Sequence, residues 1–327
     1  MPSFKIGCHG GDVKFSPFHH IRLAVAASGP LAVPSDEPLR RGRLLILNAF
    51  PSSITNFISF NTWGGLTECT WSKFSSNIIV VGDDLGSIMV FDLNRPPYSN
   101  PIASGYGNHF QISSIDWNPI RPDSFLTSGS DFTVNLWTTG EENLQSVCTF
   151  LFDNNPIHSS VWNPHHPDIF ACAGHGTLRI YDIREPRFVA KAGFGQSFRS
   201  CDWCKYNETC IVTASKSNNC ITTWDIRHTA YMVLGVEPAT VIHTANSIHK
   251  VKFLPYQEES QIVSCSENSE VALWNCRVEG PPTEKYVHHE GPVLGLDMST
   301  LVKGLMASTG LDGLVHVWNR LGAELRL

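Results

Sequence analysis

The sequence predicts an all-β fold, a seven-bladed β-propeller, because two series of large apolar residues recur in step along the chain. In the first series a short apolar strand ends in an aromatic residue followed by a small polar residue, as in "VNLWT" and "VHVWN". Its members lie about 43 to 50 residues apart, close to the period of a four-stranded propeller blade. They are Leu47, Phe91, Trp137, Tyr181, Trp224, Trp274 and Trp318.

The second series marks an earlier strand of each unit, and it fixes the number of blades. From Trp71 onward its members lie roughly 20 residues before their partners, with a strand such as "NIIVVG" between them. They are Phe15, Trp71, Trp117, Trp162, Trp203, Phe253 and Met298. One blade cannot cover both of its own faces, so blades stack radially and close into a ring. Seven such units predict a single WD-repeat propeller over residues 1–327.

Two features of this propeller concern its ends and its first unit. Phe15 and Leu47 lie further apart than the other pairs, so an exposed loop rich in proline and charge is expected at about residues 29–43. Closure of the ring needs a strand from one terminus. The segment from Phe4 to Ile6 and the C-terminal "AELRL" (323–327) are both candidates, and the sequence does not decide between them.

Composition limits the classes of function. The net charge of −6 disfavours a nucleic-acid partner, because neutralising phosphates requires a basic patch. The N-terminus shows no apolar core of a secretion signal, and "LAVAASGPLAV" is too short to span a bilayer. Ten cysteines without an export signal indicate free thiols in a reducing compartment. A cytoplasmic protein without direct membrane insertion is therefore expected.

The pair Cys201 and Cys204 in "SCDWC" has the spacing of zinc ligands or of a redox centre. Alternation along a strand places Cys201 and Trp203 on one face, with Cys204 on the other face or in the turn. No second Cys-x-x-Cys is present to complete a tetrahedral zinc site. These cysteines are interpreted as structural, and neither a metal nor a cofactor is predicted.

His289, Ser308 and Asp312 have the residue types of a hydrolase triad. In WD repeats the same types form a structural hydrogen-bond chain with the blade tryptophan, here Trp318, which satisfies buried polar groups. Only the seventh unit holds the full set. Complete dinucleotide and phosphate-binding loops are also missing from the sequence. The structural interpretation is preferred, with no catalytic residue and no enzyme.

Function is then expected on the loops that lead into the inner strands. Trp63 is the one tryptophan outside the repeat positions, and Glu68, Asp83 and Asp84 fall at the same end of the second unit. Converging carboxylates suit a lysine or arginine of a partner; the alternative is that they are solvated loop charges. Positions taken as equivalent to Glu68 in other units are Ser113, His158, Arg199, His249 and Leu294. Phe110 adds apolar area in another such loop.

The segments "SCDWCKYNE", "VKFSPF", "VKFLPY" and "HHEGPVLGLDMS" resemble the family of import receptors for the type-two peroxisomal targeting signal, the peroxin-seven family. The resemblance runs from about Gly7 to Trp318. It implies a receptor that binds the helical N-terminal signal of cargo proteins. It also implies that a co-receptor helps to deliver the cargo to the peroxisomal docking machinery, by shuttling between the cytoplasm and the peroxisomal membrane and matrix.

The resemblance assigns the cargo cation to Glu68 and Asp84, with Asp83 as a neighbour. It assigns the apolar side of the cargo helix to Trp63, Phe110 and Leu294. Two alternatives stay open at this point. One is a WD-repeat scaffold or adaptor of another complex, such as a chromatin or ubiquitin-ligase complex, and the other is an enzyme. Binding of the targeting helix tests the first, and labelling of Ser308 by an active-site probe tests the second.

Overall fold

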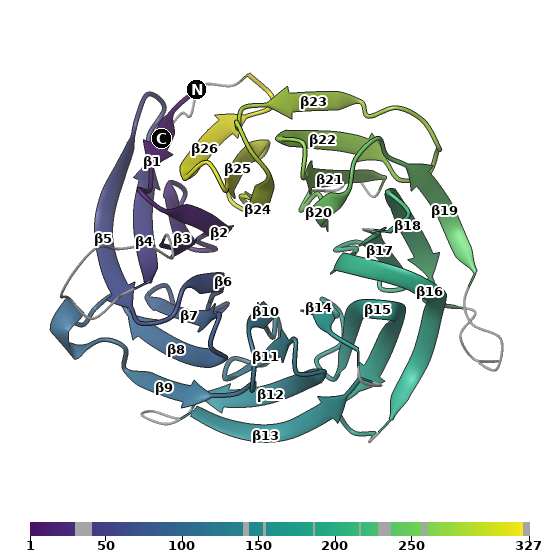
Figure 1. Ribbon diagram of the computed structural model, residues 1–327, viewed down its shortest axis with the longest axis horizontal. Coiled ribbons are helices and arrows are strands. Elements are labelled where there is room, and N and C mark those ends of the chain that lie inside the picture. The colour runs from purple at the N-terminus through teal and green to yellow at the C-terminus, as the bar shows by residue number, and fades with distance from the viewer. Residues whose placement is uncertain are drawn as a thin grey trace.

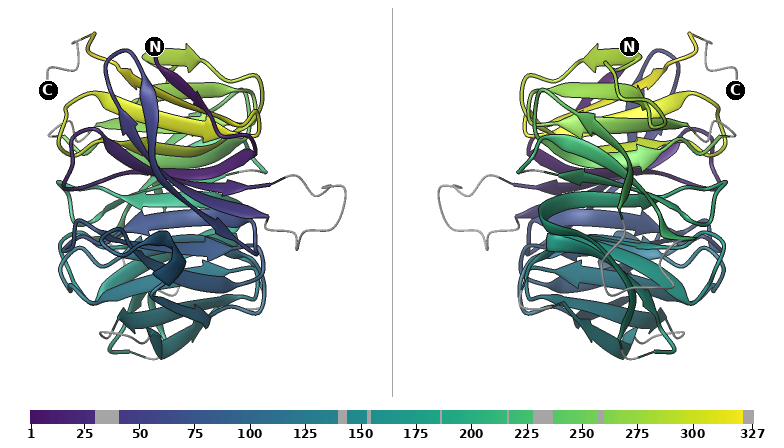
Figure 2. Two further views of the ribbon diagram at one scale, coloured as in Figure 1. Left: turned by 90° about the vertical axis from the view of Figure 1, so that its left-hand side faces the viewer. Right: turned by 90° about the vertical axis from the view of Figure 1, so that its right-hand side faces the viewer.

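The computed structural model describes residues 1–29, 41–139, 144–152, 155–185, 187–215, 217–227, 237–256 and 260–322. Antiparallel strands are arranged radially, each sheet beginning beside a central axis and ending at the outer edge (Figure 1). Seen from the side, the ring is thinner than it is wide (Figure 2). The predicted propeller is confirmed.

The first three blades follow the chain in order. The first consists of β2 (His9–Phe15), β3 (Arg22–Ser28), β4 (Gly42–Ala49) and β5 (Ile54–Thr62). The second consists of β6 (Leu66–Trp71), β7 (Ile78–Asp83), β8 (Ser87–Asp92) and β9 (Ala103–Tyr106), with the short 3-10 helix η1 (Pro97–Ser99) before β9. The third consists of β10 (Ile112–Trp117), β11 (Ser124–Gly129), β12 (Thr133–Thr139) and β13 (Leu144–Leu151).

The fourth and fifth blades share one hydrogen-bonded sheet, because two long strands each occupy two positions. The sheet contains β14 (Ile157–Trp162), β15 (Ile169–Asp182), β16 (Phe188–Trp203), β17 (Cys210–Ser215), β18 (Cys220–Asp225) and β19 (Pro238–His243). The start of β15 pairs with β14 and its end with β16, whereas the end of β16 pairs with β17. Gly176 and Gly193, at φ 89° and 68°, supply left-handed backbone where these strands bend.

The last two blades complete the ring. The sixth contains β20 (Ile248–Phe253), β21 (Gln261–Ser266), β22 (Glu270–Asn275) and β23 (Glu284–Val287). The seventh contains β24 (Val293–Met298), β25 (Leu305–Gly310) and β26 (Leu314–Asn319), and its outer strand is β1 (Ser3–Lys5) from the N-terminus. Of the two candidate closing segments, the N-terminal one therefore pairs with the last blade. Residues 323–327, and residues 30–40 of the loop expected at 29–43, lie outside the described residues.

The apolar core lies between the blades. Across the described chain, buried apolar side chains form seven clusters, each shared by two neighbouring blades. In one of them Phe15 of the first blade packs with Leu305 and Val317 of the seventh. Each sheet is thus covered on both faces by its neighbours, which leaves the central channel, the loops at the blade ends and the outer edges for binding. Of the described helical segments, none could cross a membrane.

Candidate binding site

A β-bulge in every inner strand decides which side chains face the channel. The pairing slips at one residue per blade, namely Gly11, Thr67, Ser113, His158, Arg199, His249 and Leu294. The next residue in each strand forms a ring around the axis: Asp12, Glu68, Ser114, Ser159, Ser200, Lys250 and Gly295. The predicted alignment of Glu68 with Ser113 was therefore wrong by one residue, since Thr67 occupies that position.

Three charged members of this ring meet in a buried ion cluster, although they come from the first, second and sixth blades. Lys250 crosses the channel, and its Nζ lies 2.6 Å from Asp12 Oδ1 and 2.6 Å from Glu68 Oε1. Lys14 Nζ lies 2.5 Å from Asp12 Oδ2 and 3.8 Å from Glu68 Oε2. Asp12 and Glu68 are both buried. The carboxylate of Glu68 thus already has cationic partners within the protein.

Burial and repulsion separate the two carboxyl groups in pKa. Desolvation, followed by the neighbouring charge of Asp12, raises the pKa of Glu68 to about 7 in spite of Lys250 and Lys14. Burial alone would raise the pKa of Asp12 as well. The positive charges of Lys14, Lys250 and Lys252 outweigh this effect and hold the pKa of Asp12 well below its usual value. The two groups titrate as a pair, and of the two carboxyl groups Glu68 is the one that binds a proton at the higher pH.

A second ring lies one position before the end of each inner strand and ties neighbouring blades together. Its aspartates Asp116, Asp202 and Asp297 accept hydrogen bonds from the backbone N–H groups of Trp162, Phe253 and Phe15 in the next blade, at 2.8, 2.9 and 2.8 Å. Lys252 Nζ lies 2.6 Å from Asp297 Oδ1. The second ring and the members of the first ring other than Asp12 and Gly295 line a channel cavity of about 210 Å³. Its charges are used to hold the ring of blades together.

Asp83 and Asp84 lie at the turn between β7 and β8 but have different surroundings. Asp83 is buried, and its Oδ1 accepts hydrogen bonds from the backbone N–H groups of Leu85 and Ser87 at 3.0 and 2.7 Å, so it stabilises the turn. Asp84 is half-buried; its Oδ1 accepts one hydrogen bond, 2.9 Å long, from the backbone N–H of Gly65. Asp84 forms no ion pair with any residue that the structure describes, unlike Glu68.

Three large apolar side chains are exposed on the loops and turn around Asp84. Trp63 is 61% exposed, Leu85 55% and Phe110 61%. Together, Trp63, Asp84, Leu85 and Phe110 form what is termed the rim patch below. Leu85 was not among the predicted contact residues, and the signal for it was a leucine in a tight turn directly after two aspartates. Leu294, a predicted contact, is half-buried in the seventh blade and lies outside the rim patch.

Two glycines hold the loops of the rim patch against the turn that carries Asp84. A Cβ atom added to Gly64, next to Trp63, would lie 2.3 Å from Asp83 Oδ2. A Cβ added to Gly86 would lie 2.8 Å from the carbonyl oxygen of Phe110, and Gly86 has φ 85°. No side chain fits at either position. The loops before β6 and β10 therefore approach the same turn closely.

The predicted hydrogen-bond chain of the seventh blade is present only in part. His289 Nδ1 lies 2.8 Å from Asp312 Oδ2, and His289 Nε2 lies 2.8 Å from Ser308 Oγ. The indole nitrogen of Trp318 has no hydrogen-bond partner among the described residues, so it is not the fourth link. His289 and Ser308 are buried, which separates Ser308 from any dissolved substrate.

A complete chain occurs instead in the third blade, so the prediction that only the seventh blade holds the full set was wrong. Trp137 Nε1 donates to Thr127 Oγ1 at 3.0 Å, and Thr127 Oγ1 donates to Asn108 Oδ1 at 3.0 Å. Asn108 Nδ2 then donates to Asp131 Oδ1 at 2.8 Å. Asparagine can replace histidine here because its amide also offers an N–H donor on one side and an oxygen acceptor on the other.

The cysteine pair divides between two interfaces, as the strand alternation predicts. Cys201 packs with Trp203 between the fourth and fifth blades, whereas Cys204 packs between the fifth and sixth. Desolvation raises the pKa of the Cys201 thiol to about 12, against a smaller effect of its hydrogen bond to Ser159. Such a thiol is a poor nucleophile and a poor metal ligand. All ten cysteines are free thiols.

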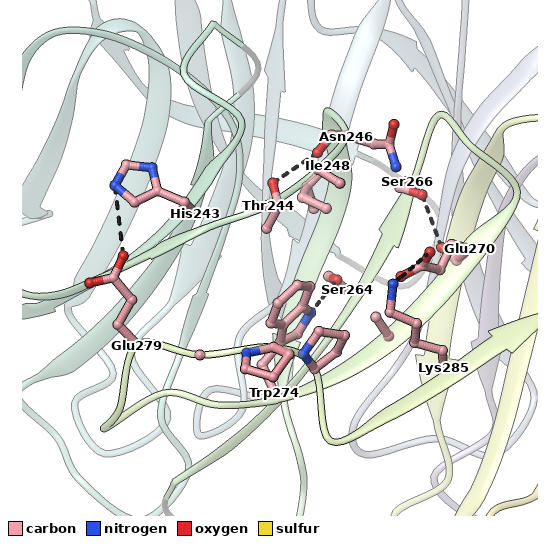
Figure 3. Close-up of a pocket in the computed structure, with 15 residues that line it drawn as sticks. His243, Thr244, Asn246, Ile248, Ser264, Ser266, Glu270, Trp274, Glu279 and Lys285 are labelled. Atoms are coloured by element: carbon pink, nitrogen blue, oxygen red, sulfur yellow. Dashed lines mark hydrogen bonds and ion pairs between the residues drawn. The ribbon is translucent and has the colours of Figure 1, made fainter.

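A separate hollow lies between the fifth and sixth blades, with a volume of about 350 Å³ (Figure 3). Trp274 lines it and donates its indole N–H to Ser264 Oγ at 2.8 Å. Its charged groups are already paired, since Lys285 lies 3.2 Å from Glu270 and His243 lies 3.9 Å from Glu279. None of the predicted site residues lines this hollow.

Comparisons with known proteins give a consistent result over nearly the whole chain. The chain is 39% identical to peroxisome biogenesis protein 7 of Arabidopsis thaliana over 323 residues, which is 98% of each chain. It is 33% identical to the mouse peroxisomal targeting signal 2 receptor over 319 residues, covering 96% of this chain and 94% of the relative. The receptor of the same name from Saccharomyces cerevisiae is 25% identical, with 97% and 98% covered. No protein-family model matches the chain.

Proposed function

The chain belongs to the peroxin-7 family of receptors for the type-two peroxisomal targeting signal, and we propose that it binds the helical signal of cargo proteins at the rim patch. Together with a co-receptor it then delivers the cargo to the peroxisomal docking machinery, cycling between the cytoplasm and the peroxisome. One observation carries the choice of site. Asp84 is a carboxylate without a cationic partner in the described chain, and three exposed apolar side chains lie on the same turn and on the loops that approach it.

An amphipathic helix has the complementary surface. Its apolar residues recur every three to four positions and form a stripe, and a lysine or arginine one or two turns away lies beside that stripe. Trp63, Leu85 and Phe110 offer apolar area to the stripe, and aromatic anchors of this kind dominate binding energy when they become desolvated. Asp84 offers a charge-assisted hydrogen bond to the cation. This is the helix-in-groove mode of peptide recognition.

Glu68 and Asp83 contribute to this site indirectly. Glu68 is paired with Lys250, and Asp83 is engaged by two backbone N–H groups. Direct contact with a cargo cation would require Glu68 to give up Lys250, which would then lie buried beside Asp12 only. We therefore assign the direct contact to Asp84, with Asp83 holding the turn in place and Glu68 holding the blades around the channel.

The shape of such a complex is compatible with a co-receptor. A helix lying on the open face of a ring buries only one side, so its other side stays in water. A second protein that covers the exposed side adds buried area and slows dissociation. We propose that the co-receptor binds across both the cargo helix and the surrounding loops of the propeller.

The test is the binding of a fluorescent type-two signal peptide to the full chain, with and without a co-receptor fragment. Asp84→Asn keeps an oxygen for the Gly65 N–H but removes the charge, and roughly a tenfold loss of affinity is expected. Trp63→Ala is expected to cost between about 10- and 100-fold. Asp123→Asn is the matched control, because Asp123 is an exposed carboxylate in the turn at the opposite end of the third blade; it should bind as the unmodified chain does.

Two results would change the conclusion in different ways. Peptide binding that neither Asp84→Asn nor Trp63→Ala weakens, with circular dichroism unchanged, would keep the receptor and move its site elsewhere. No binding, with or without a co-receptor, would favour the alternative function, a WD-repeat scaffold of another protein complex.

A further inference from the structure

A cluster of metal-ligating side chains lies in the seventh blade, away from both the rim patch and the channel. His289, Asp312 and His316 each offer one ligand atom, and these atoms all lie within 4.8 Å of one another. His289 is 5% exposed and His316 7%. The three residues come from the loop before β24, the turn between β25 and β26, and β26 itself. The cluster thus joins three segments of one blade.

His316 is the unexplained member of the cluster. Both of its ring nitrogens are buried, and neither has a hydrogen-bond partner among the described residues. A neutral imidazole carries one N–H donor and one lone pair, so two polar groups are left unsatisfied in the core. The repeat does not require a histidine here, since the equivalent positions, two residues before the aromatic residue of the strand, hold Met89 in the second blade and Ala272 in the sixth.

In the third blade the equivalent polar residue is satisfied. Asn135 Nδ2 donates to the carbonyl of Gly107 at 2.6 Å, and Asn135 Oδ1 accepts from Thr149 Oγ1 at 2.6 Å. A buried polar residue at this position is therefore stable when it has partners. The two free nitrogens of His316 indicate a partner that the protein chain itself does not provide.

His289 already takes part in a hydrogen-bond chain within this blade. Its Nδ1 lies 2.8 Å from Asp312 Oδ2 and its Nε2 lies 2.8 Å from Ser308 Oγ. A neutral imidazole satisfies both contacts when Nδ1–H donates to the carboxylate and Nε2 accepts from the serine hydroxyl. A metal ion that binds Nδ1 takes the place of this proton, as metal ligation by histidine requires.

We propose that a zinc ion binds between His289 Nδ1, Asp312 and His316. Imidazole nitrogen and carboxylate oxygen are ordinary zinc ligands, and three of them leave a fourth tetrahedral position for water. Mixed nitrogen and oxygen ligands favour zinc over calcium and magnesium, which prefer oxygen only. Ser308 serves as the outer partner that fixes the orientation of His289, as such partners commonly do. His289 and Asp312 were interpreted from the sequence as members of a structural chain, and nothing in the repeat pattern distinguished His316.

The position of the site suggests its role. His316 lies opposite Ser3 where β1 pairs with β26, so it belongs to the strand that closes the ring. A zinc ion held by His316 and by the two segments on its other side would fasten β26 at the closure point. Binding energy of a structural metal adds directly to folding stability. The site is a clamp on the ring and is independent of the proposed cargo site.

The experiment uses the full chain without a histidine tag, freed of metal by a chelator and titrated with Co²⁺. Tetrahedral Co²⁺ in a nitrogen and oxygen site absorbs visible light, so the titration should saturate at one ion per chain and Zn²⁺ should bleach the colour. Zn²⁺ should also raise the melting temperature of the chain relative to the chelated protein.

The test variant is His316→Leu, which removes one ligand and both unsatisfied nitrogens. Its melting temperature in chelator should not fall, and its zinc affinity should fall by more than the roughly 10- to 100-fold that loss of an outer partner costs. Asp312→Asn is a second variant, which keeps an oxygen for the N–H groups of Glu290 and Leu314. His20→Ala removes an exposed histidine and is the control, with unchanged binding. The proposal is overturned if no stoichiometric Co²⁺ signal forms, or if His316→Leu and Asp312→Asn bind zinc as the unmodified chain does.

Discussion

The ion cluster of the channel makes stability depend on pH in a way that Glu68→Gln should remove. The pKa of Glu68 rises from an ordinary value of 4.5 to about 7, mainly through burial. Between these two values the folded state holds the Glu68 proton and the unfolded state has lost it. The free energy of unfolding contributed by this group therefore falls as pH rises across that range. A glutamine at this position does not titrate, so the variant lacks this fall.

The magnitude follows from the same shift. Linkage over the interval from about pH 5 to pH 8 gives a loss of about 2 to 3 kcal/mol from Glu68. Asp12 contributes no slope there, because its pKa is lowered and its stabilising effect is lost only below the ordinary value of 3.8. Burial lowers the pKa of His316 to about 4, so its contribution rises with pH and opposes that of Glu68. Only the difference in free energy of unfolding between Glu68→Gln and the unmodified chain isolates the contribution of Glu68.

The assay is urea unfolding of both chains at several pH values across this interval. The free energy of unfolding of Glu68→Gln, relative to that of the unmodified chain, should rise by about 2 to 3 kcal/mol from the acid to the alkaline end. Glu237→Gln is the control, since Glu237 is exposed just before β19, and the difference in free energy of unfolding between this variant and the unmodified chain should stay constant. A constant difference for Glu68→Gln too would mean that Lys14 and Lys250 fully offset its burial, and the reasoning would be refuted.

Three other changes test the fold and its thiols. Asn108→Ala breaks the third-blade chain and should lower the free energy of unfolding by about 2 to 3 kcal/mol, whereas the exposed Asn94→Ala should change it by less than about 0.5 kcal/mol in the same urea titration. Deleting residues 1–6 removes β1 and buried Ile6 and should cost at least about 2 kcal/mol; an unchanged calorimetric melting curve would speak against N-terminal closure. In the native chain, exposed Cys148 should react with a thiol reagent and buried Cys201, with its pKa of about 12, should not; mass spectrometry that finds Cys201 modified first would contradict this.

The blade architecture could be predicted from the sequence because packing between blades repeats the same demand seven times. Trp71, Trp203 and Trp224 mark their strands because each fills an interface with a neighbouring blade, and all three are fully buried. A large side chain at the same position in each blade therefore recurs along the sequence with the period of the blades. The closing strand was not decided, because the three residues of β1 carry no repeat of their own.

The contacts across the ring could not be predicted in the same way. Lys250 and Asp12 are separated by 238 residues, and only closure of the propeller brings them together. The one-residue error at Glu68 has a local cause, since a bulge adds a residue to one strand without a sequence signature. Asn108 was missed for a related reason. The repeat was expected to place a histidine at this position, whereas the hydrogen-bond chain requires only a side chain with both a donor and an acceptor.

The structure separates acidic residues that the fold uses from those left available to a partner. Glu68 and Asp83 have partners that hold the channel and a turn in place, whereas Asp84 has no cation beside it among the residues that the structure describes. Two variants make this distinction measurable. Glu68→Gln should change the pH dependence of unfolding and leave peptide affinity within about twofold, because its charge is already neutralised inside the protein. Asp84→Asn should weaken the peptide about tenfold with little change in unfolding. If both variants weakened binding equally, the carboxylates of the second blade would attract the cargo cation jointly, and the assignment of the cation to Asp84 alone would be wrong.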